Sequence, residues 1–366
     1  MQRVALSWDD LAGKALARQF PETALDVAAA VGAIGPLQTQ TARSAFLGLA
    51  ARFPGTTRDA VTAAYESGEI VRGSTIRGTV HTTTPGSYAD LGAATAVGQR
   101  TLWDRMLHLE RSSIDDLWSA TEAYASTWRT TDELQEHLHR WLVEHEGSDD
   151  ITGQQAGRYL AFGHGGLVRR PVNGDWAGQG APEYVHLPGS GTVEAALELH
   201  LRCHGPASRH DLAWWSGMGL RVVDEVLAAI DARIGLTSAD GPDGRTYVDL
   251  PDAPAPRTLD GVRLLPEFDA LMCAYDPAGR VRFAEAAHLT RLWSGANGLV
   301  LPPLLVDGRI TGYWRAAGNS RRRPLEVTWF SRTRRPRKDE LDEPVAALET
   351  GLGIAVTSVT ITRELV

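Results

Sequence analysis

Two glutamines, Gln38 and Gln40, are the residues whose type and spacing point most directly to chemistry. They lie at the start of a helix that hydrophobic periodicity predicts over residues 39–53. Residues two apart cannot face the same way within a helix, but where an extended segment meets a helix both can project into one cleft. A carboxamide is neither a base nor a nucleophile; it can orient a water molecule and stabilise positive charge on a sugar. The alternative is that both side chains only satisfy backbone groups at the helix end.

The other familiar catalytic motifs do not occur in the sequence. It contains no Walker loop, dinucleotide-binding glycine motif, Gly-x-Ser-x-Gly elbow or His-Glu-x-x-His motif, which excludes the usual cofactor enzymes. His200, His204 and His210 lie near Cys203 and could form a metal site, but we expect them to be hydrogen-bonded or solvated helix residues. Only one other cysteine, Cys273, is present, so no disulfide framework is expected. The sequence predicts neither a metal nor a cofactor.

The charge distribution indicates a phosphate-bearing partner. The net charge of the 366-residue chain is −8, yet residues 309–338 hold ten basic residues and one acid, a local charge of +9. The remainder therefore carries −17. The basic residues flank alternating apolar segments, so we expect them on folded structure rather than in a disordered run. Such a patch on an acidic protein is typical of nucleic-acid binding.

The elements that position these residues recur along the chain. A helix–helix–hairpin order, typical of a winged helix-turn-helix, is predicted three times. The hairpins fall at residues 70–83, 165–187 and 235–248, and the second unit includes predicted helices at 131–144 and 151–162. Beyond residue 260, short strands predict a small β-barrel or curled sheet whose second hairpin carries Arg321, Arg322 and Arg323 near its tip. The predicted fold is α+β, with winged helices at 1–86, 87–190 and 191–256 and a barrel at 257–366.

Length and composition also indicate in which cellular compartment the protein is expected. A composition of 43% hydrophobic and 22% charged residues is typical of a globular protein. No uninterrupted apolar stretch approaches the roughly 20 residues that cross a bilayer, so no membrane association is expected. The first residues contain no apolar signal-peptide core and become acidic at Asp9. We therefore expect a cytoplasmic protein.

Five segments in the same order resemble the AlkZ family of azinomycin-resistance DNA glycosylases and related winged-helix alkylpurine DNA glycosylases. The first resembles the family's Gln-x-Gln catalytic motif, and the others resemble its first wing, third helix-turn-helix and barrel motifs. They are Pro36–Gln40, Arg77–His81, Gly205–Gly217, Leu264–Asp269 and Val306–Arg315. Thr39 departs from the aliphatic residue usual between the glutamines. One branch of the family has Asp in place of Gln40, so the resemblance places this chain with the branch specialised for bulky adducts.

The resemblance implies both a shape and an activity. Three winged helices and a barrel would form a C around duplex DNA, and the protein would remove bulky N7-alkylated guanine, including crosslinked guanine. That activity would give self-resistance to a DNA-alkylating natural product. Gln38 and Gln40 would be catalytic. The residues expected to contact DNA are Arg72, Arg77 and His81 of the first wing and Arg321, Arg322 and Arg323 of the basic hairpin.

The chemistry of such a substrate suits these residues. N7 alkylation makes guanine cationic, so its glycosidic bond breaks through an oxocarbenium-like state with little need for a general acid. Gln38 and Gln40 could hold the attacking water near C1′ and support that cation. The motif contains no lysine, which argues against a Schiff-base lyase step and for a monofunctional hydrolase.

Two other functions remain open on the sequence. A non-catalytic winged-helix DNA-binding protein, such as a regulator or adduct sensor, would use the same units without releasing a base. Such a regulator would usually be a symmetric dimer, whereas we expect the glycosylase to be a monomer. A protein-interaction scaffold would instead use the acidic remainder of the chain.

Overall fold

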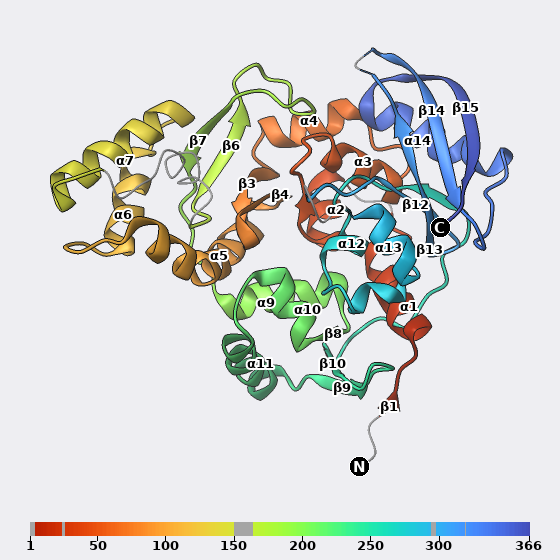
Figure 1. Cartoon of the computed structure of the whole chain (residues 1–366), viewed down its shortest axis with the longest axis horizontal. Helices are drawn as coiled ribbons and strands as arrows, with labels where there is room; N and C mark the ends of the chain where they lie inside the picture. Colours follow the sequence, from red (N-terminus) through yellow and green to blue (C-terminus); the bar gives the residue numbers. More distant parts are fainter. Residues whose placement is uncertain (1–3, 24–25, 150–163, 294–297, 319) are drawn as a thin grey trace.

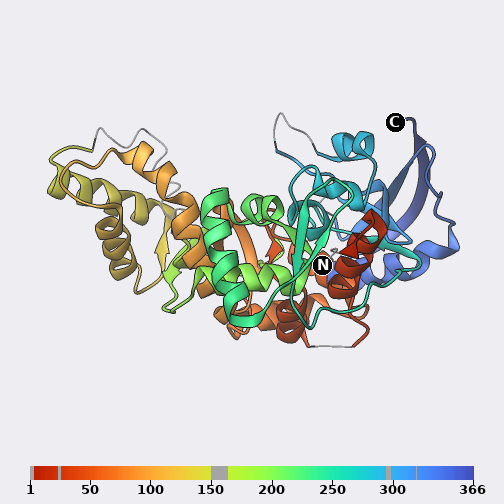
Figure 2. The same ribbon diagram turned by 90° about the horizontal axis from the view of Figure 1, so that it is seen from below.

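The computed structural model describes residues 4–23, 26–149, 164–293, 298–318 and 320–366. It combines helices with three sheets, which confirms a mixed α and β fold. Figures 1 and 2 both place helices α6 (Ile114–Tyr124) and α7 (Thr131–Glu146) at one end of the molecule and the C-terminal strands at the other. The predicted helix at 151–162 lies outside the described residues.

The first sheet joins the first two units of the chain. Its strands lie in the order β2-β4-β3-β6-β7-β5, and the two units meet where β3 pairs with β6 at Gly73 and Val168. The α5 helix supports this junction, because the Tyr88 hydroxyl donates to the Leu167 carbonyl at 2.7 Å. The elements are α2 (Val27–Ile34), β2 (Leu37–Gln38), α3 (Ser44–Arg52), α4 (Arg58–Glu66), β3 (Val71–Thr75), β4 (Thr79–Thr83), α5 (Pro85–Leu107), β5 (Arg129–Thr130), β6 (Leu167–Pro171) and β7 (Pro182–His186).

The third unit forms a separate four-stranded sheet with the N-terminal segment. Strand β1 pairs in parallel with β9, giving the order β1-β9-β10-β8. Its elements are β1 (Val4–Ala5), α1 (Trp8–Gln19), α9 (Val193–His204), β8 (Ala207–Ser208), α10 (Arg209–Ser216), α11 (Leu220–Ile234), β9 (Thr237–Asp240) and β10 (Thr246–Asp249). The first and third units show the predicted order of two helices and a hairpin, whereas in the second unit the predicted helix at 151–162 lies outside the described residues. The assignment of the units as winged helices stays a prediction.

The C-terminal sheet is open, which agrees with the small barrel or curled sheet predicted from the sequence if the barrel is a half-barrel. Its five strands lie in the order β11-β12-β13-β14-β15, and among the described residues the edge strands β11 and β15 do not pair. The long β14 pairs in parallel with β15, because α14 returns the chain between them. Its elements are β11 (Val262–Leu264), α12 (Ala270–Cys273), α13 (Ala286–Leu292), β12 (Pro303–Val306), β13 (Arg309–Ala316), β14 (Arg322–Phe330), α14 (Asp342–Leu352) and β15 (Ala355–Glu364).

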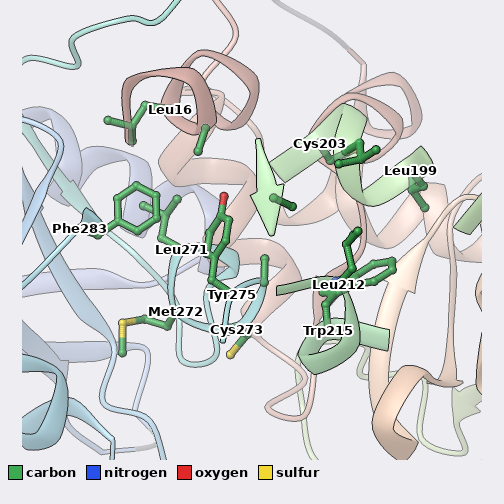
Figure 3. Packing of buried hydrophobic residues seen from close by; sticks show 14 of the residues in the cluster. Leu16, Leu199, Cys203, Leu212, Trp215, Leu271, Met272, Cys273, Tyr275 and Phe283 are labelled. Atoms are coloured by element: carbon green, nitrogen blue, oxygen red, sulfur yellow. The ribbon is translucent and has the colours of Figure 1, made fainter. Parts of the chain in front are cut away.

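Two hydrophobic cores connect segments that are distant in sequence. One joins α1, the third unit and the start of the C-terminal region, with Leu16, Trp215 and Tyr275 among its buried side chains (Figure 3). The other joins the first unit to the C-terminal sheet, with Phe46 and Trp314 among its members. The first unit is therefore held between the third unit and the C-terminal sheet, where its position is fixed on both sides.

A buried ion pair strengthens the connection between the first unit and the C-terminal region. The Arg52 guanidinium donates to both carboxylate oxygens of Asp269, at 2.9 and 3.0 Å, and both side chains are fully buried. The same guanidinium also donates to the Gln19 side-chain oxygen at 3.0 Å. This network ties α3, which follows the glutamine motif, to the segment before α12.

Replacing Asp269 with asparagine should lower the free energy of unfolding by about 3–5 kcal/mol, because the charge of Arg52 would stay buried without a carboxylate. Urea unfolding of the purified proteins measures the change. The matched control is Glu225→Gln, which removes the partner of Arg221 on the surface of α11. That control should cost less than about 1 kcal/mol. Equal losses in the two variants would contradict the assigned role of the buried pair.

Within the part of the chain that the structure describes, no helix is both long enough and apolar enough to cross a bilayer.

Candidate active site

Gln38 lies on strand β2 and Gln40 lies in the bend that follows, so neither is in the first turn of a helix. Leu37 and Gln38 pair with β4, and the Thr39 amide donates to the Val80 carbonyl at 2.7 Å. The predicted helix at 39–53 begins only at Ser44. The hairpin of β3 and β4 thus adds Leu37 and Gln38 as an extra strand, and the helix begins later than the predicted extended-to-helical junction.

Between Gln38 on β2 and Gln40 in the bend, Thr39 turns its side chain into the protein. Thr39 is buried, and its hydroxyl lies 3.2 Å from that of Thr82. Gln38 is half-buried and Gln40 is exposed. That both carboxamides project into one cleft stays a prediction. The motif thus opens onto the surface.

A glycine before the motif allows the chain to approach the third unit closely. Gly35 ends α2 with a φ of +84°, and a Cβ placed there would lie 2.8 Å from the Cβ of Cys203 on α9. A larger residue would therefore clash and be strained. The backbone entering the motif is fixed against a buried helix.

The side-chain oxygen of Gln38 is fixed by Arg77. The Arg77 guanidinium donates to Gln38 Oε1 at 3.0 Å and to the carbonyl oxygen of Trp215 at 2.5 Å. Arginine has no acceptor, so the atom facing it must be the amide oxygen. Gln38 consequently keeps two N–H donors and one oxygen lone pair for other partners.

The side-chain oxygen of Gln40 is also fixed by a hydrogen bond, in this case from the backbone of β4. The amide of Val80 donates to Gln40 Oε1 at 3.3 Å, which again identifies the facing atom as oxygen. The Gln179 side chain donates to the backbone carbonyl of Gln40 at 3.2 Å. Both carboxamides thus point their oxygen toward the protein.

Arg77 therefore has a different position from the predicted phosphate contact. It occupies the tight turn between β3 and β4 with a φ of +58°, and burial lowers the pKa of its guanidinium. Among the described residues it forms no ion pair with a carboxylate. Its guanidinium lies beside Gln38 and links the turn between β3 and β4 to the end of α10.

His81 is also placed inside the protein, which contradicts its predicted contact with DNA. Its side chain is buried, with Nδ1 3.0 Å from the Thr79 carbonyl and 2.8 Å from the Thr75 hydroxyl. A carbonyl only accepts, so Nδ1 carries the proton. Burial and the charge of Arg77 lower the pKa of His81 to about 3. The imidazole is neutral and offers no charge to a phosphate.

Three buried histidines make the stability of the protein depend on pH. Burial lowers the pKa of His81 and His200 to about 3 and that of His204 well below its usual value. Below pH 6.5 the unfolded chain binds protons that the folded chain does not. Stability should therefore be complete above pH 6.5 and fall as the pH drops, by up to roughly 1.4 kcal/mol per pH unit for each histidine.

Urea midpoints at pH 7.5 and 5.5 measure this loss, and His200→Gln should reduce the difference between them. An unchanged difference in that variant would show that His200 does not contribute.

Arg72 is enclosed as well, so the predicted phosphate contact fails for it. The side chain is buried, donates to the Trp176 carbonyl at 3.0 Å, and lies over the rings of Tyr65 and Trp176. These two rings stack with centroids 4.4 Å apart. Arg72 thus holds the loop between β6 and β7 against the first unit.

The basic hairpin remains at the surface, but its three arginines are not equivalent. Arg321 and Arg322 are exposed and Arg323 is half-buried. Arg321 and Arg323 line a cleft that also contains Thr41, the residue after Gln40, whereas Arg322 does not line it. The sequence grouped the three arginines, and strand alternation separates them.

Three residues near the motif were not among those that the sequence predicted for the site. Val80 acts through its backbone amide, and Gln179 lies 139 residues from Gln40. Arg43 lines the same cleft as Arg321 and Arg323. Only Arg43 had a local signal, as a basic residue just after the glutamines.

The histidine group is part of the core rather than an evident metal site. His200 Nε2 lies 2.9 Å from the Ala274 carbonyl, and Gln19 Nε2 lies 3.2 Å from His204 Nδ1. Within the described ranges, no group of three or more His, Cys, Asp or Glu side chains could hold a metal ion.

Two comparisons with known proteins gave a match, one to a family model and one to a solved structure. The family model of AlkZ-like DNA glycosylases matches residues 31–350, which include both glutamines and the basic hairpin. The fold is similar to that of the Streptomyces sahachiroi DNA glycosylase AlkZ, with a TM-score of 0.78, 21% identity, and coverage of 99% of this chain and 100% of that chain. No curated protein sequence matches the chain. Because the family model spans most of the sequence, the chain belongs to the AlkZ-like DNA glycosylases.

Proposed function

We propose that this DNA glycosylase hydrolyses the N-glycosidic bond of bulky N7-alkylguanine in duplex DNA, with Gln38 and Gln40 as its catalytic residues. The observation that carries the proposal is the fixed orientation of both carboxamides, one held by Arg77 and the other by the backbone amide of Val80. The proposal extends to crosslinked guanine and to self-resistance against a DNA-alkylating natural product. A monomeric state and a cytoplasmic location remain predictions.

The fixed amide orientation favours water placement over direct support of the sugar cation. The oxygens are the negative ends of the carboxamides, and both already accept a hydrogen bond from the protein. Each amide can still donate to a water oxygen and accept one of its protons, which places the water near C1′. The cationic base supplies the driving force for bond cleavage, since the electrons of the glycosidic bond leave with it as neutral N7-alkylguanine. The water adds to C1′ of the sugar cation and releases one proton to solvent.

The exposure of the motif supports a bulky substrate. Gln38 is half-buried and Gln40 is exposed, so the site is not the bottom of an enclosed pocket. An enzyme that extrudes its target base needs a pocket matched to that base. An open site can accept an adduct or a crosslink that such a pocket would exclude.

The substrate is tested by single-turnover base release from two duplexes, one with N7-methylguanine and one with a bulky N7 adduct. We expect release from both, with the bulky adduct processed at least as fast as the small one. The product should be an intact abasic strand that breaks only after heat or alkali. Rejection of the bulky adduct would contradict the proposed substrate. Strand cleavage without alkali would contradict a monofunctional hydrolase.

The non-catalytic alternatives find no comparable support. Membership in a glycosylase family favours an enzyme over a regulator, an adduct sensor or a protein-interaction scaffold.

A further inference from the structure

Four arginines from three separate parts of the chain converge in one cleft of about 680 Å³. Arg43 immediately precedes α3, Arg58 begins α4, and Arg321 and Arg323 belong to the hairpin between β13 and β14. We name this feature the arginine cleft. Figure 1 shows α3 and α4 beside the C-terminal sheet, so the cleft lies where the first unit meets that sheet.

The positive charge in the arginine cleft is only partly neutralised. Arg58 pairs with Asp175 at 3.0 Å, and Arg43 pairs with Glu267. Among the described residues, Arg321 and Arg323 form no ion pair. Burial and the nearby charge of Arg43 lower the pKa of Arg323. Like charges gathered in this way are stabilised when an anion binds between them.

The arginine cleft is continuous with the proposed catalytic segment. Thr41, which follows Gln40, forms part of its wall. Gln179 forms another part and donates to the backbone carbonyl of Gln40. An anion held in the cleft would therefore lie beside Gln40.

We propose that the arginine cleft binds a backbone phosphodiester of the strand that carries the target nucleotide, next to that nucleotide. This inference rests on the proposed function. Guanidinium groups present planar pairs of donors that match phosphate oxygens. The cleft is open, so a continuous strand can pass through it. Binding there fixes the distance between the strand and the Gln40 side chain.

The first test compares single substitutions on one hairpin. Arg323→Gln and Arg321→Gln should each weaken binding to duplex DNA and reduce the slope of log K against log salt by about one. The matched control is Arg322→Gln, which removes the same charge from a neighbouring residue that does not line the cleft. An equal change in all three variants would indicate general electrostatic attraction between the hairpin and DNA. That result would overturn the proposal of a phosphate site in the arginine cleft.

The second test locates the phosphate with a double-mutant cycle. Each phosphate within three nucleotides of the adduct is replaced in turn by an uncharged methylphosphonate, and binding is measured for wild type and Arg323→Gln. We expect one position at which the loss of affinity caused by the methylphosphonate and the loss caused by Arg323→Gln are not additive. At that same position, the loss caused by Arg322→Gln should add fully to the loss caused by the methylphosphonate. Additive losses at every position would overturn the proposal.

The design separates failure of this inference from failure of the proposed function. Both tests measure binding and need no base release. A coupled phosphate with no base release would support the cleft and contradict the enzyme mechanism. Base release together with additive losses at every phosphate would support the enzyme mechanism and contradict the proposed role of the cleft.

Discussion

Replacing Gln38 or Gln40 with alanine should slow base release at least tenfold, about 1.4 kcal/mol, while leaving DNA affinity nearly unchanged. Either change removes the amide that holds the attacking water but leaves the fold intact, because neither side chain is part of a core. Single-turnover kinetics at equal DNA occupancy measure the effect.

The matched control is Gln135→Ala on α7, which makes the same chemical change outside the site. Its rate should equal that of wild type. A rate loss in the motif variants that disappears when DNA is saturating would assign the glutamines to binding. That outcome would contradict a catalytic role.

Replacing Arg77 with methionine should slow base release by roughly ten- to a hundredfold, because Gln38 would lose the donor that fixes its oxygen. Small displacements of a positioning group can have effects of this size. Arg77→Lys should restore little activity, because one ammonium group cannot reproduce the planar fork that reaches both Gln38 and the Trp215 carbonyl. The rate constant at saturating DNA is the measurement.

The salt dependence of DNA binding distinguishes this role from the phosphate contact that the sequence predicted. A positioning residue should leave the slope of log K against log salt unchanged, whereas a phosphate ligand should reduce it by about one. A reduced slope with an unchanged rate would contradict the positioning role. Thermal unfolding of Arg77→Met checks that the variant is folded.

The sequence predicted local structure well because local signals determine it. The wing strands at 70–83 follow from a run of β-branched residues, and the structure confirms them as β3 and β4. The basic hairpin followed from alternating apolar segments and was confirmed as β13 and β14. The glutamine motif was identified from its residues and their resemblance to a family.

Contacts distant in sequence account for what the sequence could not predict. The helix after Gln40 starts late because Thr39 pairs with Val80. Arg72 and His81 resemble exposed wing residues in sequence, yet Trp176 covers one and neighbouring threonines enclose the other. Whether the C-terminal strands close completely depends on tertiary contacts, and among the described residues the edge strands β11 and β15 do not pair.

The most direct test of the central claim is base release from duplex DNA that carries N7-methylguanine, followed by the same assay with a bulky N7 adduct. Strand cleavage after alkali reports each abasic site, and wild type is compared with the double variant Gln38→Ala/Gln40→Ala at equal occupancy. We expect wild type to release the base and the double variant to lose nearly all activity. Binding of both substrates by wild type without release of either base would contradict the account.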